Sequence, residues 1–384
     1  MIPLSVPNVG GNAAAYVQAC LDSGWVSSAG AFVERFEREF ASYTGARHAI
    51  ACVNGTAALQ LALQLAGVRH GDLVLVPTLT FIATVNAAHY LGAEPVFLDS
   101  DDAYCLDPDA VLGFLDEHTE RRDDGSYERA SGRRVAAVLP VHVFGNAARL
   151  GPLLAPLRDA GVALVEDAAE SLGTVYTAGA LAGRHTGTVG ALGCFSFNGN
   201  KIITTGGGGM IVTDDDALAE RARYLSTQAK DDEVHYVHHD VGYNFRLTNL
   251  QAALGVAQLE ELPTFLETKR QNFLRYRAAL EQVAGLELAD GPAYARNNHW
   301  LYAVQIDAAR FGRDRERVMA DLTEAAIQTR PLWELNHRQR PYRHCRHERV
   351  TRALLLHERT LNLPCSTNLR PDEVDRVCEA LRGG

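Results

Sequence analysis

The chain has 384 residues, of which 47% are hydrophobic and 22% charged, and its net charge at pH 7 is −10. This size and balance are typical of a globular protein with two domains, or with one large domain and a smaller appended one. Because the acidic residues are spread along the chain, the charge argues against a nucleic-acid or anionic-membrane partner, which would need clustered lysine and arginine.

The cysteines and the N-terminus indicate a cytoplasmic protein. Seven cysteines are scattered through mostly apolar stretches without a C-x-x-C pair, as free buried thiols are in a reducing compartment. Residues 1–7 show neither the basic nor the apolar region of a signal peptide, and no apolar run reaches the roughly 18 residues of a membrane span. We therefore expect no membrane partner.

Helical patterns over residues 12–22 and 32–43 are followed by a regular alternation of short apolar runs and helical runs. Continuous apolar strands between helices are buried on both faces, so the alternation predicts an α/β fold with a mostly parallel sheet. The charged residues 120–134 interrupt it, and we interpret them as a surface loop or as a basic contact for a charged ligand. The apolar runs are 48–53, 73–76, 95–98, 135–139 and 162–165.

The pattern changes in the last third of the chain. A long helical region covers about 250–283, interrupted at Pro263, with Thr248 or Asn249 as its N-cap. This composition predicts a smaller α+β domain. A half-exposed antiparallel strand is expected at 300–306, and further helices at about 314–326 and 371–382.

Polar side chains follow several of the predicted parallel strands, at the edge where such sheets bind ligands. Asn54-Gly55-Thr56-Ala57 stands at a strand-to-helix junction, where Gly55 lets the backbone turn tightly. Thr56 and Ala57 then present free N–H groups at a helix N-terminus, which suits an anion such as phosphate. The alternative is a plain helix cap without a ligand.

Asp167 and Phe81 lie at the ends of two other predicted strands. A carboxylate at this edge is partly desolvated and needs a partner, for which a protonated ring nitrogen is suitable; otherwise Asp167 is a helix N-cap. Phe81 either stacks on a planar ring or belongs to the core.

Lys201 lies between the apolar run 191–197 and the glycine cluster 206–209. A lysine held by a strand on one side and bare backbone on the other suits a covalent bond to a flat cofactor, although a solvated loop lysine has the same pattern. Ser196, five residues earlier, offers a hydroxyl for phosphate. Schiff-base lysine, ring-nitrogen acid, stacking aromatic and phosphate-binding N–H groups together form the set that a pyridoxal phosphate site needs.

The sequence resembles the DegT/DnrJ/EryC1/StrS family of nucleotide-sugar aminotransferases. The resemblance is carried by Asn54-Gly-Thr-Ala57, Glu166-Asp-Ala-Ala169, Phe195-Ser-Phe197 with Lys201, and Gly242-Tyr-Asn-Phe-Arg-Leu-Thr-Asn249. It implies a fold type I pyridoxal phosphate enzyme with a seven-stranded, mostly parallel sheet in a large domain, 1–249, and a smaller domain, 250–384, on which the N-terminal segment can pack. It also implies a homodimer with shared active sites.

The resemblance implies a role for each matching residue. Lys201 forms the Schiff base, Asp167 pairs with the pyridine nitrogen, and Phe81 stacks on the ring. Glu170 stands where many members have Gln or His near the ring hydroxyl; since a carboxylate would repel a phenolate there, either a proton is shared or Glu170 turns away. The other expected cofactor contacts are Gly55, Thr56, Ala57, Ser196, Asn198 and, from the second subunit, Asn244.

The segments 24–28, 227–232 and 329–337 are most similar to the branch that aminates C4 of a UDP-linked 2-acetamido-4-keto-6-deoxyhexose for legionaminic acid or bacillosamine-type surface glycans. This implies L-glutamate as amino donor and a pyridoxamine phosphate form of the cofactor. GDP-4-keto-6-deoxymannose, which leads to perosamine, and dTDP-keto sugars are alternative acceptors. Expected substrate contacts are Trp25, Ser28, Lys230, Arg330 and His337.

Rival functions have weaker support in the sequence. A dehydratase of the same fold replaces the Schiff-base lysine with histidine, whereas Lys201 is present. A regulatory protein that keeps the cofactor without turnover is distinguished by adding glutamate and following the cofactor spectrum. We expect no metal site, because the histidines near positions 235–239 and 344–347 lack zinc-site spacing.

Overall fold

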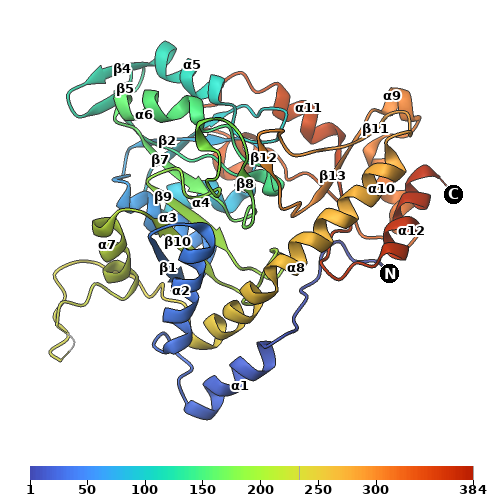
Figure 1. Cartoon of the computed structure of the whole chain (residues 1–384). Helices are drawn as coiled ribbons and strands as arrows, with labels where there is room; N and C mark the ends of the chain where they lie inside the picture. Colours follow the sequence, from blue (N-terminus) through green and yellow to red (C-terminus); the bar gives the residue numbers. More distant parts are fainter. Residues whose placement is uncertain (233, 384) are drawn as a thin grey trace.

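Within residues 1–232 and 234–383, which the computed structural model describes, a nine-stranded sheet forms the centre of the molecule (Figure 1). Neighbouring strands from β9 to β3 are parallel, whereas β10 is antiparallel to both of its neighbours. The predicted α/β fold with a mostly parallel sheet is therefore confirmed. The main path runs through β1 (His48–Cys52), β10 (Gly209–Thr213), β9 (Leu192–Ser196), β7 (Ala163–Asp167), β6 (Arg134–Val138), β2 (Leu73–Pro77) and β3 (Glu94–Leu98).

The charged insertion at 120–134 is not a loop but a hairpin of β4 (Thr119–Arg122) and β5 (Gly125–Glu128), and β5 pairs with β6. The prediction of a surface loop was wrong because the polar side chains hide the strand pattern. Arg133 Nη1 donates to Glu94 Oε2 at 2.7 Å, so part of the basic charge is used inside the fold.

Helices cover both faces of the sheet. Because side chains alternate along a strand, Val74 and Val76 of β2 face one helical layer while Leu73 and Leu75 face the other. One layer contains α3 (Gly55–Leu65), α4 (Ile82–Tyr90) and α7 (Asp216–Ser226). The opposite side packs against α2 (Ala31–Thr44), α5 (Pro108–His118), α6 (Leu154–Ala160) and part of α8 (Asn249–Leu280).

The long helix α8 connects the sheet to the C-terminal part (Figure 1). Thr248 is its N-cap, with a reciprocal capping box to Gln251, as predicted. The helix continues through Pro263, so the predicted interruption was wrong. Pro263 lies on the exposed side, while Leu262 and Phe265 beside it pack in the core, and this burial holds the helix together across the missing N–H.

The far end of α8 packs in a second core. Phe273 and Tyr276 contact residues of a four-stranded sheet and of helices α10 (Arg315–Glu324) and α12 (Pro371–Arg382). Ile2 lies in the same core, and its N–H donates to Ala326 O at 2.9 Å. The division at residue 249 stays a prediction, because α8 joins both cores. The small sheet has the order β11 (Leu286–Leu288), β13 (Tyr302–Ile306), β15 (Thr360–Leu363) and β14 (Arg330–Pro331).

The remaining elements are short or lie at the periphery. No helix in the ranges 1–232 and 234–383 has the length and apolarity that a membrane crossing requires. These elements are α1 (Ala13–Ser23), α9 (Ala308–Phe311), α11 (Arg352–Arg359), the paired strands β8 (Val175–Tyr176) and β12 (Ala295–Arg296), and the 3-10 turns Val143–Gly145, Gly151–Leu153, Gly179–Leu181, Asn336–Arg338 and Arg340–Tyr342.

Candidate active site

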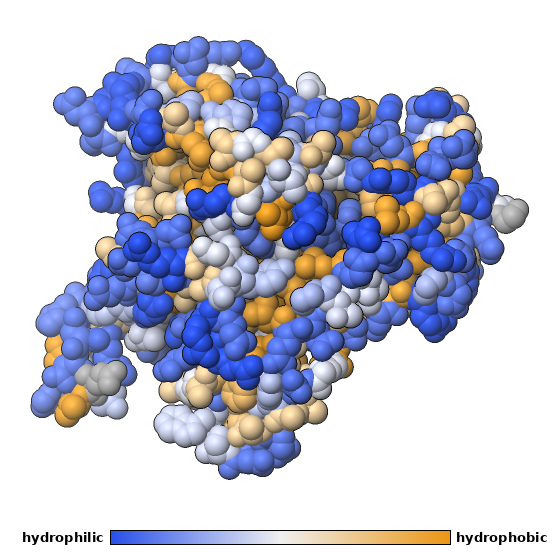
Figure 2. Space-filling model, in the orientation of Figure 1, coloured by the Kyte–Doolittle hydropathy of each residue, from blue (hydrophilic) through white to orange (hydrophobic). Residues whose placement is uncertain are grey.

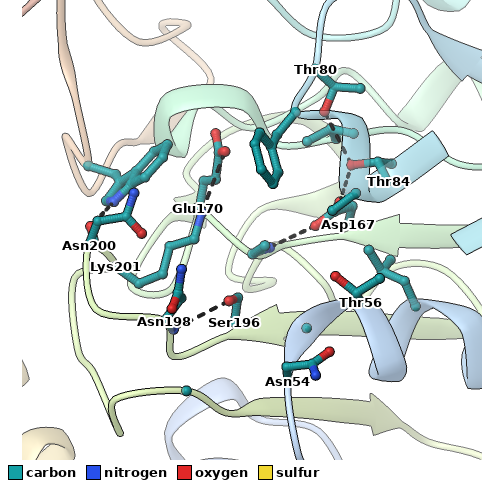
Figure 3. Close-up of a pocket in the computed structure, with 18 of the residues that line it drawn as sticks. Asn54, Thr56, Thr80, Thr84, Asp167, Glu170, Ser196, Asn198, Asn200 and Lys201 are labelled. Atoms are coloured by element: carbon teal, nitrogen blue, oxygen red, sulfur yellow. Dashed lines mark hydrogen bonds and ion pairs between the residues drawn. The ribbon is translucent and has the colours of Figure 1, made fainter. Parts of the chain in front are cut away.

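A pocket opens at the carboxyl ends of the parallel strands, between the starts of α3 and α4 (Figure 3). Lys201 and Asp167 both line it, and Figure 3 shows them on opposite sides with Ser196 between them. The two groups on which the sequence interpretation depended therefore share one cavity. Residues from the sequence prediction that line it are Gly55, Thr56, Phe81, Asp167, Glu170, Ser196, Asn198 and Lys201.

Asp167 is the last residue of β7 and is 3% exposed. Its Oδ2 accepts a hydrogen bond from Thr84 Oγ1 at 2.7 Å, and its Oδ1 accepts one from the Ala169 N–H at 3.0 Å. Burial raises the pKa of the Asp167 carboxyl, while these hydrogen bonds oppose the shift. The site thus holds a carboxyl group in a fixed orientation, ready for a cationic N–H partner.

Lys201 follows β9 through a turn in which its N–H donates to Asn198 O at 3.0 Å. Its Nζ lies 3.6 Å from Glu170 Oε1 and 4.0 Å from the centre of the Trp300 ring. The side chain is only 13% exposed, so the amine is placed by its surroundings and not by solvent.

Glu170 faces Lys201 instead of turning away from the pocket (Figure 3). Its Oε2 accepts a hydrogen bond from the Phe144 N–H at 2.8 Å. Burial raises the pKa of Glu170 to about 7, and the Lys201 amine opposes the shift. Glu170 therefore exchanges a proton near neutral pH, so it can present a neutral carboxyl group that donates a hydrogen bond.

The junction 54–57 lies against Ser196. A side-chain carbon at Gly55 would stand 2.9 Å from Ser196 Cβ, so only glycine lets this backbone approach so closely. The Ala57 N–H, however, donates to Asn54 Oδ1 at 2.8 Å and is not free as predicted. The N–H groups of Gly55 and Thr56 donate to no acceptor among the described residues. These two N–H groups at the helix N-terminus are therefore available to bind an anion.

The outer part of the pocket is aromatic. Phe81 is 52% exposed, and its ring centre lies 6.4 Å from that of Trp333. An exposed phenylalanine at a pocket rim is able to stack on a planar ring bound in the pocket.

Seven predicted residues do not line this pocket: Ala57, Trp25, Ser28, Lys230, Asn244, Arg330 and His337. The Trp25 side chain is 61% exposed, and Ser28 is also exposed. Lys230 Nζ lies 5.6 Å from the Tyr236 ring centre in the segment before α8. In one chain, these residues do not reach the pocket that Lys201 and Asp167 line.

Three further residues, Asn244, Arg330 and His337, form contacts elsewhere in the fold. Asn244 forms an isolated bridge with Thr227 and is exposed. Arg330 Nη1 donates to Thr329 O at 2.8 Å. His337 Nδ1 lies 2.6 Å from Thr78 Oγ1, and burial lowers the pKa of His337. Their substrate roles stay predictions.

The structure adds pocket residues that the sequence interpretation missed: Thr80, Thr84, Asn200, Trp300 and Trp333. Thr84 lies four residues after Thr80, so both hydroxyls fall on the same side of the chain, 3.2 Å apart, and this spacing was a usable signal. Trp300 was assigned to a strand pattern, and nothing local marks it as a neighbour of Lys201. In residues 1–232 and 234–383, no group of three or more His, Cys, Asp or Glu side chains could hold a metal ion.

Comparisons with known proteins agree with this geometry. A model of the DegT/DnrJ/EryC1/StrS aminotransferase family matches residues 7–382. The chain is 37% identical over 381 residues to the GDP-perosamine synthase of Caulobacter vibrioides, covering 99% of this chain and 97% of that protein. It is 38% identical over 385 residues to EpsN of Bacillus subtilis, a putative pyridoxal phosphate-dependent aminotransferase, covering 99% and 95%.

Solved structures show the same similarity over the whole fold. The crystal structure of DesI in the presence of its TDP-sugar product is 32% identical to this chain, with a TM-score of 0.86. The match covers 98% of this chain and 91% of DesI.

Proposed function

The chain belongs to the DegT/DnrJ/EryC1/StrS aminotransferase family, and from this membership we propose the site residues, amino donor and acceptor sugar of its reaction. The chain is a pyridoxal phosphate-dependent transaminase that acts on nucleotide-linked sugars. We propose that it moves the amino group of L-glutamate to C4 of a 4-keto-6-deoxyhexose. The observation that carries the proposal is the shared pocket of Lys201 and Asp167.

The residues of the pocket fit the cofactor. Gly55 lies so close to Ser196 that a Cβ at this position would fill the space between them. The two free N–H groups at the start of α3 can bind an anion in this space. We assign the cofactor phosphate to Gly55, Thr56 and Ser196, with Asn198 close by. Asp167 would face the ring nitrogen, Phe81 would cover the ring, and Glu170 would lie near its hydroxyl.

Bound pyridoxal phosphate supplies an aldehyde that condenses with amines and a ring that delocalises negative charge. Lys201 would hold the resting cofactor. Once free, its amine would take the proton from Cα of the donor and pass it to the carbon that carried the cofactor's aldehyde, and in the second half-reaction it would move a proton from that carbon to C4 of the sugar. Asp167 keeps a proton on the ring nitrogen, and Thr84 fixes the carboxylate for this task. A neutral Glu170 donates its proton in a hydrogen bond, which removes the repulsion that its carboxylate would cause.

We place GDP-4-keto-6-deoxymannose first among the acceptors. The support is the GDP-perosamine synthase of Caulobacter vibrioides, which this chain matches over 99% of its length. The UDP-linked 2-acetamido-4-keto sugar expected from the segments 24–28, 227–232 and 329–333 with His337 remains the second candidate. Of these segments, 329–333 contributes Trp333 to the pocket of the single chain, whereas 24–28 and 227–232 do not line it.

We further propose a homodimer whose two active sites are shared. The segment between α7 and α8 projects from the body (Figures 1 and 2) and carries exposed apolar side chains at Val234, Tyr236 and Val241. Apolar residues on a projecting segment suit burial against a second subunit. Asn244 at the base of this segment would then reach the phosphate of the other subunit's cofactor. All seven cysteines are free and buried, which supports a cytoplasmic location.

Incubating the purified protein with pyridoxal phosphate, glutamate and a panel of GDP-, UDP- and dTDP-linked 4-keto-6-deoxy sugars tests the proposal. We expect amino-sugar product with GDP-4-keto-6-deoxymannose at a kcat/KM above that of the other sugars, and none with the Lys201→Ala variant. Preference for a UDP- or dTDP-linked sugar would overturn the acceptor assignment. Conversion of the cofactor by glutamate without transfer to any sugar would overturn the proposed reaction.

A further inference from the structure

Lysine is rare in this chain. Of its 37 basic residues, 34 are arginine and only Lys201, Lys230 and Lys269 are lysine. Lys230 lies near the surface, and Lys201 faces the pocket. Lys269 is different, because it is buried in the middle of α8 and has no part in the reaction described above.

The Lys269 side chain is 2% exposed and is held by main-chain oxygens. Its Nζ donates to Trp300 O at 2.7 Å and to Cys365 O, and it lies 5.4 Å from the centre of the Tyr302 ring. Burial lowers the pKa of Lys269. A compact amine reaches two carbonyl groups here, which the planar fork of an arginine would not do in the same space.

Trp300 is fixed by two hydrogen bonds besides this contact. Its N–H donates to Asn298 Oδ1 at 2.9 Å, and its Nε1 donates to Asn200 O at 2.8 Å, directly before Lys201 (Figure 3). The Asn298 side chain in turn donates to Glu170 O at 2.8 Å. The same network therefore ties down both neighbours of the Lys201 amine, the indole ring and Glu170.

We propose that Trp300, held in place by Lys269, is a positioning residue that carries the free ammonium group of Lys201 on its ring face during the reaction. The Nζ lies 4.0 Å from the ring centre, well within the distance of about 6 Å at which an aromatic face attracts a cation. When Lys201 takes a proton, the ring stabilises the charge that forms and keeps the amine within reach of the pocket.

The charged groups around Lys201 show why the Trp300 ring matters for the amine. Glu170 faces the amine at 3.6 Å, Asp167 lies across the pocket, and Lys269 lines a small cavity behind Lys201. Because Glu170 exchanges its proton near neutral pH, it is not always a charged partner for Lys201. The indole face acts at every pH, so removing it affects the amine under all conditions.

Competitive labelling of amines with acetic anhydride, read by peptide mass spectrometry, tests the inference. The enzyme is used in its pyridoxamine phosphate form, in which the Lys201 amine is free. Replacing Trp300 by leucine should lower the pH of half-maximal labelling of Lys201 by about 0.5 to 1 unit, because the ammonium form loses the ring. Trp300→Phe should give a smaller shift, and Lys269→Met a shift in the same direction. The Lys230 peptide, measured in the same samples, should not change.

The proposal is overturned if the midpoint for Lys201 stays the same in Trp300→Phe and Trp300→Leu enzymes that still bind the cofactor. It is also overturned if Lys201 and Lys230 shift together, since this indicates a general loss of structure. If Trp300→Leu does not fold, the proposal is overturned by an unchanged Lys201 midpoint in both Trp300→Phe and Lys269→Met. The inference rests on the cofactor placement proposed above, but labelling requires no sugar turnover, so a wrong acceptor assignment does not affect the result.

Discussion

Lys201 Nζ and Glu170 Oε1 lie 3.6 Å apart at the inner end of the pocket. The pair joins the amine that we propose moves protons in the reaction to a carboxyl group whose pKa burial raises to about 7. A carboxylate fixed in its charged form would hold the lysine as a permanent ion pair. A carboxyl group that titrates near neutral pH can instead exist in its neutral form and donate a hydrogen bond to a group bound in the pocket.

Glu170 should make the folded chain less stable as the pH rises. Its pKa is about 7 in the folded chain and about 4.5 in the unfolded chain, so between these values the folded state binds more protons. The free energy of unfolding therefore falls with rising pH across this window. Glu170→Gln removes the effect, and relative to the wild type the cofactor-free variant should gain on the order of 1–3 kcal/mol between pH 5 and pH 8.

Urea unfolding of both proteins at the two pH values measures this difference. Glu120→Gln, at a residue of the exposed hairpin, is the control and should follow the wild type at both. A difference between Glu170→Gln and the wild type that does not change with pH would contradict the assignment of the titrating group.

Thr84 should support catalysis through Asp167. Asp167→Asn removes the charge that faces the ring nitrogen, and we expect kcat to fall by on the order of 100- to 1000-fold. Thr84→Val removes one hydrogen bond to the carboxylate, 2.7 Å long, and should cost about tenfold. Thr80→Val, one hydroxyl further away, should have a smaller effect. Steady-state kinetics with a fixed acceptor measure the series, and a Thr84 variant with full activity would show that Asp167 needs no such support.

Shared active sites predict recovery of activity in mixed dimers. Lys201→Ala should be inactive, and Asn244→Asp should be impaired because the new carboxylate repels the phosphate. A hybrid of the two chains contains one site with both native residues, so an equal mixture that is unfolded and refolded together should recover about a quarter of the wild-type activity. If Asn244 serves its own chain, the mixture will show no more than the average of the two variants.

The sheet could be read from the sequence because each parallel strand is a continuous apolar run. Val74 to Val76 and Val135 to Val138 are buried on both faces, and such burial leaves an unmistakable pattern. The hairpin at 119–128 could not be predicted from the sequence, because its strands are polar and its pairing depends on backbone hydrogen bonds to β6. The continuation of α8 through Pro263 depends on the tertiary packing of Leu262 and Phe265, which the local sequence does not show.

The candidate site likewise contains residues that the sequence reveals and residues that it does not. Asp167 is the last residue of β7, and Gly55 and Lys201 come shortly after the ends of β1 and β9, so the strand ends bring all three to one edge of the sheet. Trp300 comes from the region before β13, about a hundred residues after Lys201, and it reaches the amine through its packing in a core of the large sheet. The hydrogen bond that occupies the Ala57 N–H was also hidden, because Asn54 can serve either its own helix or a ligand.

Reduction of the cofactor-loaded enzyme with borohydride, followed by peptide mass spectrometry, identifies the amine that holds the cofactor. Reduction fixes the cofactor to the amine that holds it, and the chain offers only three lysines. We predict the added mass on the peptide that contains Lys201 and on no other. Covalent attachment should be lost completely in Lys201→Ala and should be unchanged in Lys230→Ala. Cofactor mass on Lys230 or Lys269, or none on an enzyme that binds the cofactor in full, would contradict the account.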